Sequence, residues 1–160
     1  MNKLIAQKGN ETPELLEREI IKNILKHFDS PDIIVIHGAR QVGKTCILKY
    51  LQNRFDNEGE NTFYIDLEDL RFLDIFNKGV QFVIKYLEEK GALETGKLYL
   101  FVDEIQYLDN PSNILKLMRD QYSHKIKLFV SGSSSFEIKS KFKDSLVGRT
   151  VEFEIFNLSF

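Results

Sequence analysis

The sequence is short of cysteine and proline, and it has neither tryptophan nor a long apolar segment. Its 160 residues include one cysteine, Cys46, three prolines and three histidines. A single cysteine excludes an intramolecular disulfide, and no cysteine and histidine residues cluster at the spacing of a metal site. No apolar run approaches the roughly 18 residues that span a bilayer, and no charged-then-apolar leader opens the chain. We therefore expect a cytoplasmic protein that does not interact with a membrane.

The chain also lacks a marked charge of either sign. Its 22 Lys and Arg residues against 24 Asp and Glu residues give a net charge of −2, which provides no electrostatic case for nucleic-acid binding. A short basic stretch at residues 139–143 is typical of a solvated helix face. The hydrophobic content of 42% is ordinary for a globular domain. We expect one domain over residues 1–160, with residues 1–12 flexible.

What the sequence does contain is a glycine-bounded motif at residues 38–45. These residues read Gly-Ala-Arg-Gln-Val-Gly-Lys-Thr, which matches the pattern G-x-x-x-x-G-K-[ST]. The motif follows the apolar run 33–36 and precedes an amphipathic stretch, so a strand leads into a helix. This is the context that a phosphate-binding loop requires, and it predicts that the chain binds a nucleoside triphosphate.

The chemistry of a triphosphate explains the residue types in this loop. Gly38 and Gly43 let the backbone wrap closely around an anion, and the consecutive N–H groups and the following helix N-terminus attract phosphate. Lys44 is expected to reach the β- and γ-phosphates, and the Thr45 hydroxyl to coordinate Mg²⁺. The predicted nucleotide-binding residues are Gly38, Ala39, Arg40, Gln41, Val42, Gly43, Lys44, Thr45 and Cys46.

A second buried strand is predicted at residues 98–102, and it ends in Asp103 and Glu104. Apolar residues at every position indicate a central strand of a parallel sheet, and such sheets bind ligands at the carboxyl ends of their strands. We expect Asp103 to hold Mg²⁺, because hard cations prefer oxygen ligands, and Glu104 to act as the general base on the attacking water. The alternative is that both acidic residues cap a following helix.

Polar residues also surround the last two predicted strands. The strand at residues 126–130 is followed by serines, among them Ser131 and Ser133. Their hydroxyl groups could contact the γ-phosphate or the attacking water, or could cap a helix, and the residues alone leave both interpretations open. Arg149 precedes the strand at 150–156, where an arginine could stabilise a transferring phosphoryl group. The residues alone favour a surface position for Arg149.

Helical patterns alternate with these strands along the whole chain. We predict helices at residues 13–28, 44–55, 70–90, 111–122 and 134–142, with a break in the third near residues 77–79. A further strand is predicted at residues 62–66, and the acidic residues that follow it are typical of a helix start. This alternation predicts an α/β fold in which a parallel sheet lies between two helical layers.

Taken together, the segments resemble the ATPase core of AAA+-type P-loop proteins. The resemblance is greatest to the archaeal and bacterial AAA ATPases that carry a C-terminal domain of unknown function. It rests on the motif at 38–45, on Phe-Val-Asp-Glu-Ile-Gln at 101–106, on Ser-Gly-Ser-Ser-Ser at 131–135 and on Leu-Val-Gly-Arg at 146–149. It implies a three-layer αβα P-loop NTPase fold with a parallel five-stranded sheet of order 5-1-4-3-2.

The resemblance also implies an activity. Such a domain binds ATP or ADP with Mg²⁺ and uses hydrolysis to drive conformational change in attached domains or partner proteins, with a homo-oligomer as one arrangement. It implies that Ser133, ahead of Ser131, is a sensor residue, and that Arg149 is a finger residue that acts either in its own subunit or in a neighbouring one. The alternative function is a regulatory switch that binds ATP or ADP and hydrolyses it very slowly or not at all.

Two further observations limit the predicted ATPase function. A GTPase should carry an Asn-Lys-x-Asp motif, but Asn77-Lys78-Gly79 is followed by Val80. The helical lid and the C-terminal domain of the resembling family have no counterpart in these 160 residues. We therefore expect the sequence to be a fragment of a longer protein, with weak hydrolytic activity by itself.

Overall fold

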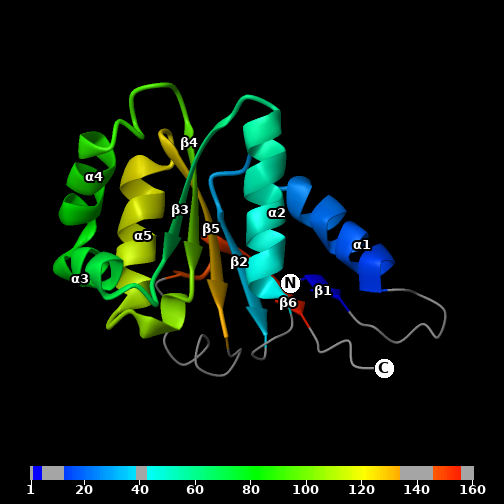
Figure 1. Ribbon diagram of the computed structural model, residues 1–160. Coiled ribbons are helices and arrows are strands. Elements are labelled where there is room, and N and C mark those ends of the chain that lie inside the picture. The colour runs from blue at the N-terminus through cyan, green and yellow to red at the C-terminus, as the bar shows by residue number, and fades with distance from the viewer. Residues whose placement is uncertain (1, 5–12, 39–42, 134–145, 156–160) are drawn as a thin grey trace.

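The computed structural model of the chain describes residues 2–4, 13–38, 43–133 and 146–155. Within them, the apolar runs that the sequence marks as buried form the middle of a parallel sheet (Figure 1). The strands are β1 (Asn2–Leu4), β2 (Ile33–Gly38), β3 (Asn61–Asp66), β4 (Leu98–Asp103), β5 (Ile126–Gly132) and β6 (Thr150–Ile155). Every position of β2, β4 and β5 is buried, as expected of strands that helices cover on both faces.

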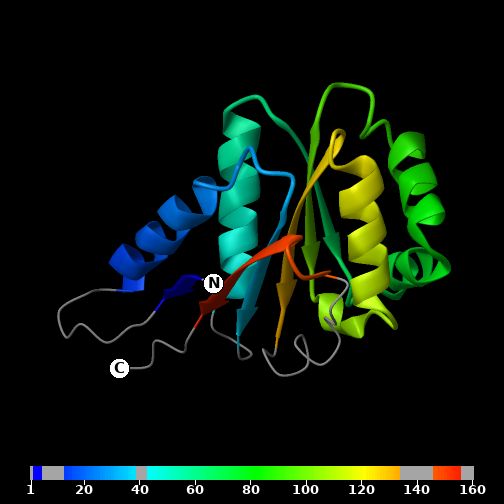
Figure 2. The same cartoon turned by 180° about the vertical axis from the view of Figure 1, so that it is seen from behind.

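The strand order in this sheet is β1-β6-β2-β5-β4-β3, and every neighbouring pair is parallel. Five of the strands therefore follow the order 5-1-4-3-2 that the family resemblance implied, and the αβα fold is confirmed. β1 is an addition at the sheet edge beside β6 (Figure 2). Its three residues carry no apolar pattern that indicates a strand. This strand lies within residues 1–12, for which flexibility stays a prediction.

Two groups of helices cover the two faces of the sheet. α1 (Pro13–Leu25) and α2 (Lys44–Asn57) lie on one face, and α3 (Leu70–Lys78), α4 (Val80–Glu89) and α5 (Pro111–Tyr122) lie on the other. The division is visible within β2. Ile34 and Ile36 belong to the core beneath α1 and α2, whereas Ile33 and Val35 belong to the core beneath the other three helices.

The helix boundaries agree closely with the predicted ones. Gly79, with φ 123°, ends α3 and precedes α4, so the break predicted at residues 77–79 is confirmed. The helix predicted at residues 134–142 lies outside the described part of the chain. Among the helices that the structure describes, none combines the length and the apolar composition needed to cross a membrane.

An aromatic cluster fixes α2 across the middle of the sheet. Phe55, near the end of α2, lies 5.9 Å from Phe101 of β4 and 5.6 Å from Phe129 of β5, measured between ring centroids. Phe101 and Phe129 stack on each other at 4.9 Å with an interplanar angle of 16°. Each such pair contributes about 0.5–1.5 kcal/mol beyond the burial of its area. The cluster holds α2 in place, and the first turn of that helix lies at the carboxyl ends of the strands (Figure 1).

Candidate functional site

The predicted phosphate loop joins the end of β2 to the start of α2. Gly38, the last residue of β2, has φ 154°, and Gly43, the N-cap of α2, has φ 93°. Residues with a Cβ rarely adopt either conformation. Gly43 caps α2 without a side-chain hydrogen bond, and the positive end of the helix dipole lies at this point. The predicted binding residues Ala39, Arg40, Gln41 and Val42 lie outside the described residues.

The residues that follow Gly43 differ in their exposure and contacts. Lys44 is only 4% exposed, which is unusual for a lysine. The Thr45 hydroxyl donates to Asp103 Oδ2 at 2.7 Å, although the two residues are 58 positions apart in the sequence. Cys46 is an exposed free thiol. The structure thus brings the two predicted Mg²⁺ residues into direct contact, and it leaves Cys46 at the surface.

The Asp103 carboxylate is buried and accepts hydrogen bonds from three hydroxyl groups. Asp103 is only 2% exposed. Oδ2 accepts from Thr45 of α2 and from the phenol of Tyr64 of β3, at 2.7 and 2.5 Å, and Oδ1 accepts from Ser131 of β5. Burying a carboxylate is costly unless such partners compensate it. Three separate elements therefore supply the groups that make an acidic residue possible at the end of β4.

The environment of Tyr64 keeps its phenol protonated. Burial raises the pKa of Tyr64 well above its ordinary value, and the hydrogen bond to Asp103 and the negative charges of Asp103, Asp66 and Glu104 raise it further. The Lys49 ammonium lies 5.6 Å from the centroid of the Tyr64 ring. Because the phenol does not ionise at ordinary pH, it acts as a hydrogen-bond donor to Asp103.

Glu104, the predicted general base, has a strained backbone conformation. Its φ of 64° and ψ of 50° place it in the left-handed region, and no other non-glycine residue in the described ranges has a positive φ. Such a conformation costs roughly 1–3 kcal/mol and persists only where surrounding contacts impose it. The Glu104 N–H donates to Ser131 Oγ at 3.0 Å, so the serine that contacts Asp103 also holds this backbone.

The side chain of Glu104 is held by Gln106. Gln106 Nε2 donates to Glu104 Oε2, and Gln106 Oε1 accepts from the Ser133 N–H at 3.2 Å. Glu104 precedes a short 3-10 helix (Ile105–Tyr107, η1) but makes no side-chain capping hydrogen bond to it. The helix-cap interpretation of the acidic pair is thus not supported. Asp103, Glu104, Ser131 and Ser133 form one network at the ends of β4 and β5.

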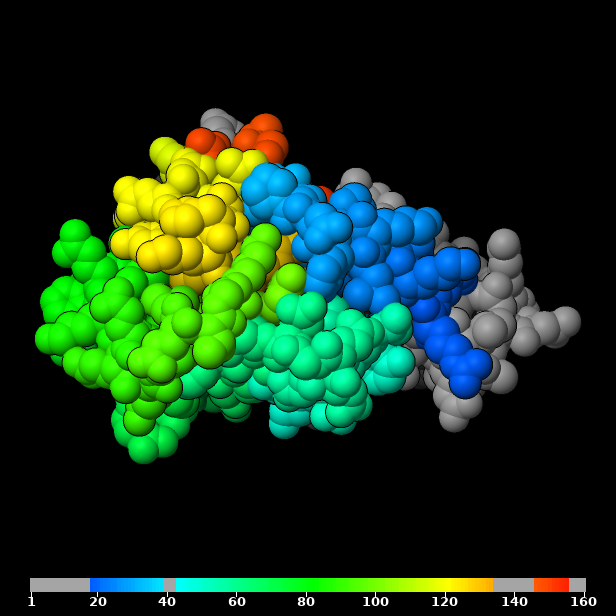
Figure 3. Space-filling model, turned by 90° about the horizontal axis from the view of Figure 1, so that it is seen from above, coloured from blue at the N-terminus to red at the C-terminus, as the bar shows by residue number. Residues whose placement is uncertain are grey.

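Arg149 lies at the opposite end of the sheet from this network. Its carbonyl oxygen accepts from the N–H of Ile33, the first residue of β2, at 2.8 Å, whereas the phosphate loop follows Gly38, the last residue. Six residues of strand span about 20 Å. The Arg149 Nε donates to Asp120 Oδ1 at 2.9 Å, and this hydrogen bond lowers the pKa of Asp120. Figure 3, viewed onto this end, shows the chain segment before β6 beside α5.

The acidic side chains at and after the end of β3 accept hydrogen bonds from nearby backbone N–H groups. Asp69 caps α3 by accepting from the Arg71 N–H at 3.0 Å, and Asp66 accepts from the Glu68 N–H at 2.9 Å. The Asp69 contact confirms the predicted helix start. No group of three or more His, Cys, Asp or Glu side chains within the described residues forms a metal cluster. Mg²⁺ commonly takes only one or two protein ligands beside phosphates and water, and the Thr45–Asp103 pair fits that requirement.

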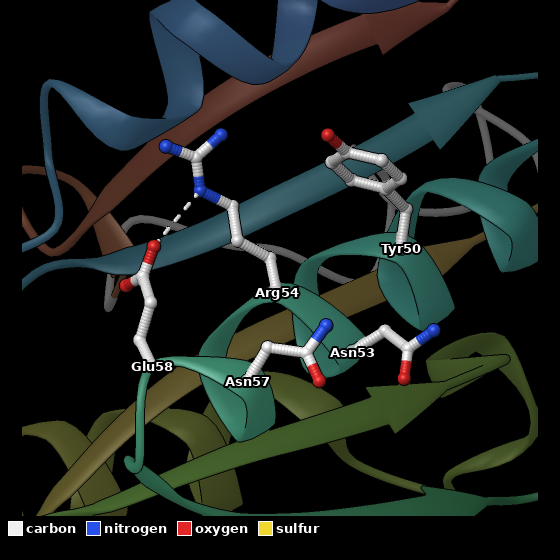
Figure 4. Close-up of a pocket in the computed structure, with 5 residues that line it drawn as sticks. All are labelled: Tyr50, Asn53, Arg54, Asn57 and Glu58. Atoms are coloured by element: carbon white, nitrogen blue, oxygen red, sulfur yellow. Dashed lines mark hydrogen bonds and ion pairs between the residues drawn. The ribbon is translucent and has the colours of Figure 1, made fainter.

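The structure also has a shallow depression away from these residues. Its volume is about 380 Å³, and its lining residues come from residues 50–57 of α2 and the residue after the helix: Tyr50, Asn53, Arg54, Asn57 and Glu58 (Figure 4). A salt bridge of 3.3 Å between Arg54 and Glu58 closes one side. Even the nearest of these residues is six positions beyond Lys44, which is about 9 Å along the helix. The depression is therefore not part of the candidate site.

Two residues of the site were not predicted from the sequence. Tyr64 could have been found only from the register of β3 on β4, because nothing in its local sequence distinguishes it from a core aromatic residue. Gln106 belongs to the segment at 101–106 that carries the family resemblance, and its proximity to Glu104 was the available signal. Both residues act on acidic groups that the sequence did predict.

A parallel sheet of this order, with a glycine-bounded loop after its second strand and an acidic pair after its fourth, defines a P-loop domain of the AAA+ class. A family model described as an AAA domain matches residues 30–160. The chain therefore belongs to this AAA domain family.

Similar sequences come from bacteria and archaea. An uncharacterized protein from Haemophilus influenzae is 27% identical over 150 residues, which are 91% of this chain and 36% of the relative. An uncharacterized protein from Methanocaldococcus jannaschii is 30% identical over 157 residues, which are 98% of this chain and 32% of the relative. The chain thus spans about a third of the length of the curated relatives it matches.

Solved structures show the same fold at low sequence identity. PCH-2 from C. elegans superposes with a TM-score of 0.60 at 18% identity, over 88% of this chain and 43% of that one. The RuvB Holliday junction branch migration motor from Thermotoga maritima gives a TM-score of 0.57 at 15% identity, over 87% and 44%. AMPPCP-bound DnaA from Aquifex aeolicus gives 0.55 at 18% identity, over 88% and 46%. At these identities the likeness concerns the fold alone.

Proposed function

We propose that this domain binds ATP with Mg²⁺ and hydrolyses it, and that turnover drives a conformational change in attached domains or partner proteins. The observation that carries the proposal is the 2.7 Å hydrogen bond between Thr45 and Asp103. Thr45 follows the phosphate-loop lysine, and Asp103 is the last residue of β4. Residues at these two positions are the protein groups that meet at Mg²⁺ in P-loop sites. The AAA domain family and the fold are consistent with nucleotide binding.

The phosphate-binding half of the site is proposed to be residues 38–46. The backbone of this segment and the first turn of α2 would hold the phosphates, and Lys44 would contact the β- and γ-phosphate oxygens. Thr45 and Asp103 would hold the metal, Thr45 through its hydroxyl oxygen. When bound there, Mg²⁺ would neutralise part of the negative charge of the phosphates.

The hydrolytic half is proposed to be Glu104 and Ser133. Glu104 would accept a proton from a water molecule as the water oxygen forms a bond to the γ-phosphorus. The bond from that phosphorus to the bridging oxygen breaks, which releases phosphate and leaves ADP. Ser133 would contact the γ-phosphate or the water. The hydrogen bond from the Glu104 N–H to Ser131 supports this assignment, because it fixes the backbone that carries the base.

Arg149 is proposed to act on the nucleotide of a neighbouring subunit. The sheet separates it from the phosphate loop of its own chain, and its contact with Asp120 holds it at the opposite end. A role in its own site would require a displacement of about a full strand length. This placement favours a homo-oligomer in which each site is completed by the next subunit.

A second candidate function is the slow or non-hydrolysing ATP/ADP switch. The observation that favours it is the hydrogen bond from Gln106 Nε2 to Glu104 Oε2. A base whose carboxylate stays bonded to an amide accepts a proton from water less readily. In that case nucleotide binding would alter partner contacts without turnover.

Phosphate release from Mg-ATP over a series of protein concentrations tests the two candidates. Glu104→Gln is the control, because it keeps an oxygen that can accept from Gln106 and removes the base. Turnover that rises more than linearly with concentration and vanishes in the variant supports an ATPase completed between subunits. Bound nucleotide without turnover in either protein supports the switch. A failure of the wild-type chain to bind nucleotide contradicts both.

A further inference from the structure

We propose that Tyr64 is a positioning residue of the Mg²⁺ site, and that its hydroxyl determines how well Asp103 supports the metal. The inference rests on the proposed function, because it concerns the carboxylate assigned to Mg²⁺ there. Tyr64 belongs to β3, a strand that carries neither the phosphate loop nor the acidic pair.

The hydrogen bonds at Asp103 are unevenly divided between its two oxygens. Oδ2 accepts both from Tyr64 at 2.5 Å and from Thr45 at 2.7 Å, whereas Oδ1 accepts from Ser131. A carboxylate offers about four acceptor positions, and these three donors approach it from β3, α2 and β5. The rotation of the carboxylate is thereby fixed before any ligand arrives.

The Tyr64 hydroxyl affects Thr45 because both hydroxyl groups donate to the same oxygen, Asp103 Oδ2. With its hydrogen directed to Oδ2, the Thr45 hydroxyl keeps its own lone pairs for a cation. That arrangement requires Oδ2 to stay where Thr45 can reach it, and Tyr64 is the other group that holds this oxygen. Loss of the phenol would let the carboxylate turn away from Thr45, so the metal would lose the alignment of two groups at once.

The ring of Tyr64 has a separate, structural role. It packs against the core beneath α1 and α2, and Lys49 of α2 lies over it. Tyr64→Phe retains the ring and removes only the hydroxyl. This substitution therefore separates the proposed positioning role from packing.

The test is a Mg²⁺ titration of the affinity for a fluorescent ADP analogue, with EDTA to define the metal-free baseline. Outer hydrogen-bond partners of metal ligands typically change metal affinity 10- to 100-fold. We expect Tyr64→Phe to keep the metal-free affinity and to raise the Mg²⁺ concentration at half-effect by roughly 10-fold. If this Mg²⁺ midpoint in Tyr64→Phe is equal to or lower than that of the wild type, the inference is overturned.

A matched control variant makes the result specific. Tyr99→Phe removes a phenol from the adjacent strand β4, where Tyr99 is 6% exposed and stacks on Phe28 at 5.0 Å, and it should leave the Mg²⁺ midpoint unchanged. A shift in Tyr99→Phe equal to the shift in Tyr64→Phe would contradict a specific role for the Tyr64 hydroxyl.

The design also separates this inference from the proposed function. If the wild-type chain binds no ADP, or binds it without any response to Mg²⁺, the proposed function fails and the inference fails with it. If the wild-type chain responds to Mg²⁺ and Tyr64→Phe responds identically, only the inference fails. The metal-free affinity of each variant serves as the check that its site is folded.

Discussion

Gln106 connects the end of β5 to the proposed base, because its side-chain oxygen accepts from the Ser133 N–H at 3.2 Å while its amide nitrogen donates to Glu104. The two contacts use opposite ends of one amide group, so its orientation is determined by its partners. A shift of the β5 end on contact with a γ-phosphate would therefore reach Glu104 directly.

We expect Gln106→Leu to lower ATP turnover by roughly 10- to 100-fold, because a base displaced by about 1 Å loses that much rate. Nucleotide affinity should stay unchanged, because Glu104 and Ser133, the partners described for Gln106, belong to the hydrolytic half of the site. Single-turnover phosphate release and fluorescent-nucleotide binding measure the two quantities. Gln52→Leu, which removes a 3.3 Å hydrogen bond from α2 to Thr62 of β3, is the matched control. Faster turnover in Gln106→Leu would instead identify Gln106 as a restraint on the base.

Gly43→Ala should destabilise the fold and abolish nucleotide binding. The left-handed φ of 93° strains any residue with a Cβ, at a cost of about 1–2 kcal/mol. Urea unfolding gives the free energy of unfolding, and equilibrium binding gives the nucleotide affinity.

Gly59→Ala is the control for that substitution. Gly59 lies in the turn after α2 with φ 81°, and a Cβ at either glycine would have no atom within 4 Å among the described residues. We expect both variants to lose similar stability and only Gly43→Ala to lose binding. Normal nucleotide affinity in Gly43→Ala would show that the predicted phosphate loop is not part of the nucleotide-binding site.

Stability should rise with pH above about 8 because of Lys127. This buried lysine donates to the carbonyl oxygens of Ser30 and Asp32 at 2.6 and 2.5 Å. Burial, and to a lesser extent the charge of Lys97, lowers the pKa of Lys127 from 10.5 to about 8. Between these two values the unfolded chain binds the extra proton, so deprotonation favours the folded state. Below about pH 8 both states are protonated, and the folded state bears the full cost of the buried charge.

The comparison that checks this dependence is between the wild-type chain and Lys127→Met. From pH 7.5 to pH 10.5, the free energy of unfolding of the wild type should increase by roughly 1–3 kcal/mol relative to that of the variant. Lys125→Met, at an exposed neighbouring position, should follow the wild type. Parallel curves for wild type and Lys127→Met would show that Lys127 keeps an ordinary pKa.

Mixing two inactive variants tests where Arg149 acts. Arg149→Ala and Glu104→Gln should each lack turnover as pure proteins. In a mixture, an Arg149→Ala subunit keeps its own base and receives an arginine from a Glu104→Gln neighbour, so partial activity should return. Phosphate release at fixed total protein, with the ratio of the two variants changed, measures the recovery. No recovery at any ratio, in a mixture that forms oligomers, would contradict action between subunits.

The apolar runs and turn residues predicted where five strands lie and that they form a parallel sheet, because such runs report burial directly. The order of these strands followed from the family resemblance. The sequence also predicted that Thr45 and Asp103 meet, since the carboxyl ends of parallel strands share one edge. It did not predict the left-handed conformation of Glu104, which depends on Ser131 holding the Glu104 N–H from a different strand. The contact between Tyr64 and Asp103 likewise depends on strand register, which no local pattern specifies.

Arg149 shows a different limit of sequence reasoning. A position before the last strand is compatible with a role in either subunit, and only the parallel pairing of β6 with β2 places it at the amino end of the sheet. The contact with Asp120 is equally non-local, since the two residues are 29 positions apart. Charge and spacing in the sequence give no information about such a pair.

The three hydroxyl donors around Asp103 affect how an inactive variant should be chosen. Asparagine at this position would present one accepting oxygen and one NH₂ group, so at least one of Thr45, Tyr64 and Ser131 would meet a donor where it now meets an acceptor. An unsatisfied buried group costs about 1–3 kcal/mol, and loss of activity in Asp103→Asn would combine a folding defect with a catalytic one. Glu104→Gln disturbs no comparable set of donors, and it is the variant from which a loss of chemistry can be read without a loss of structure.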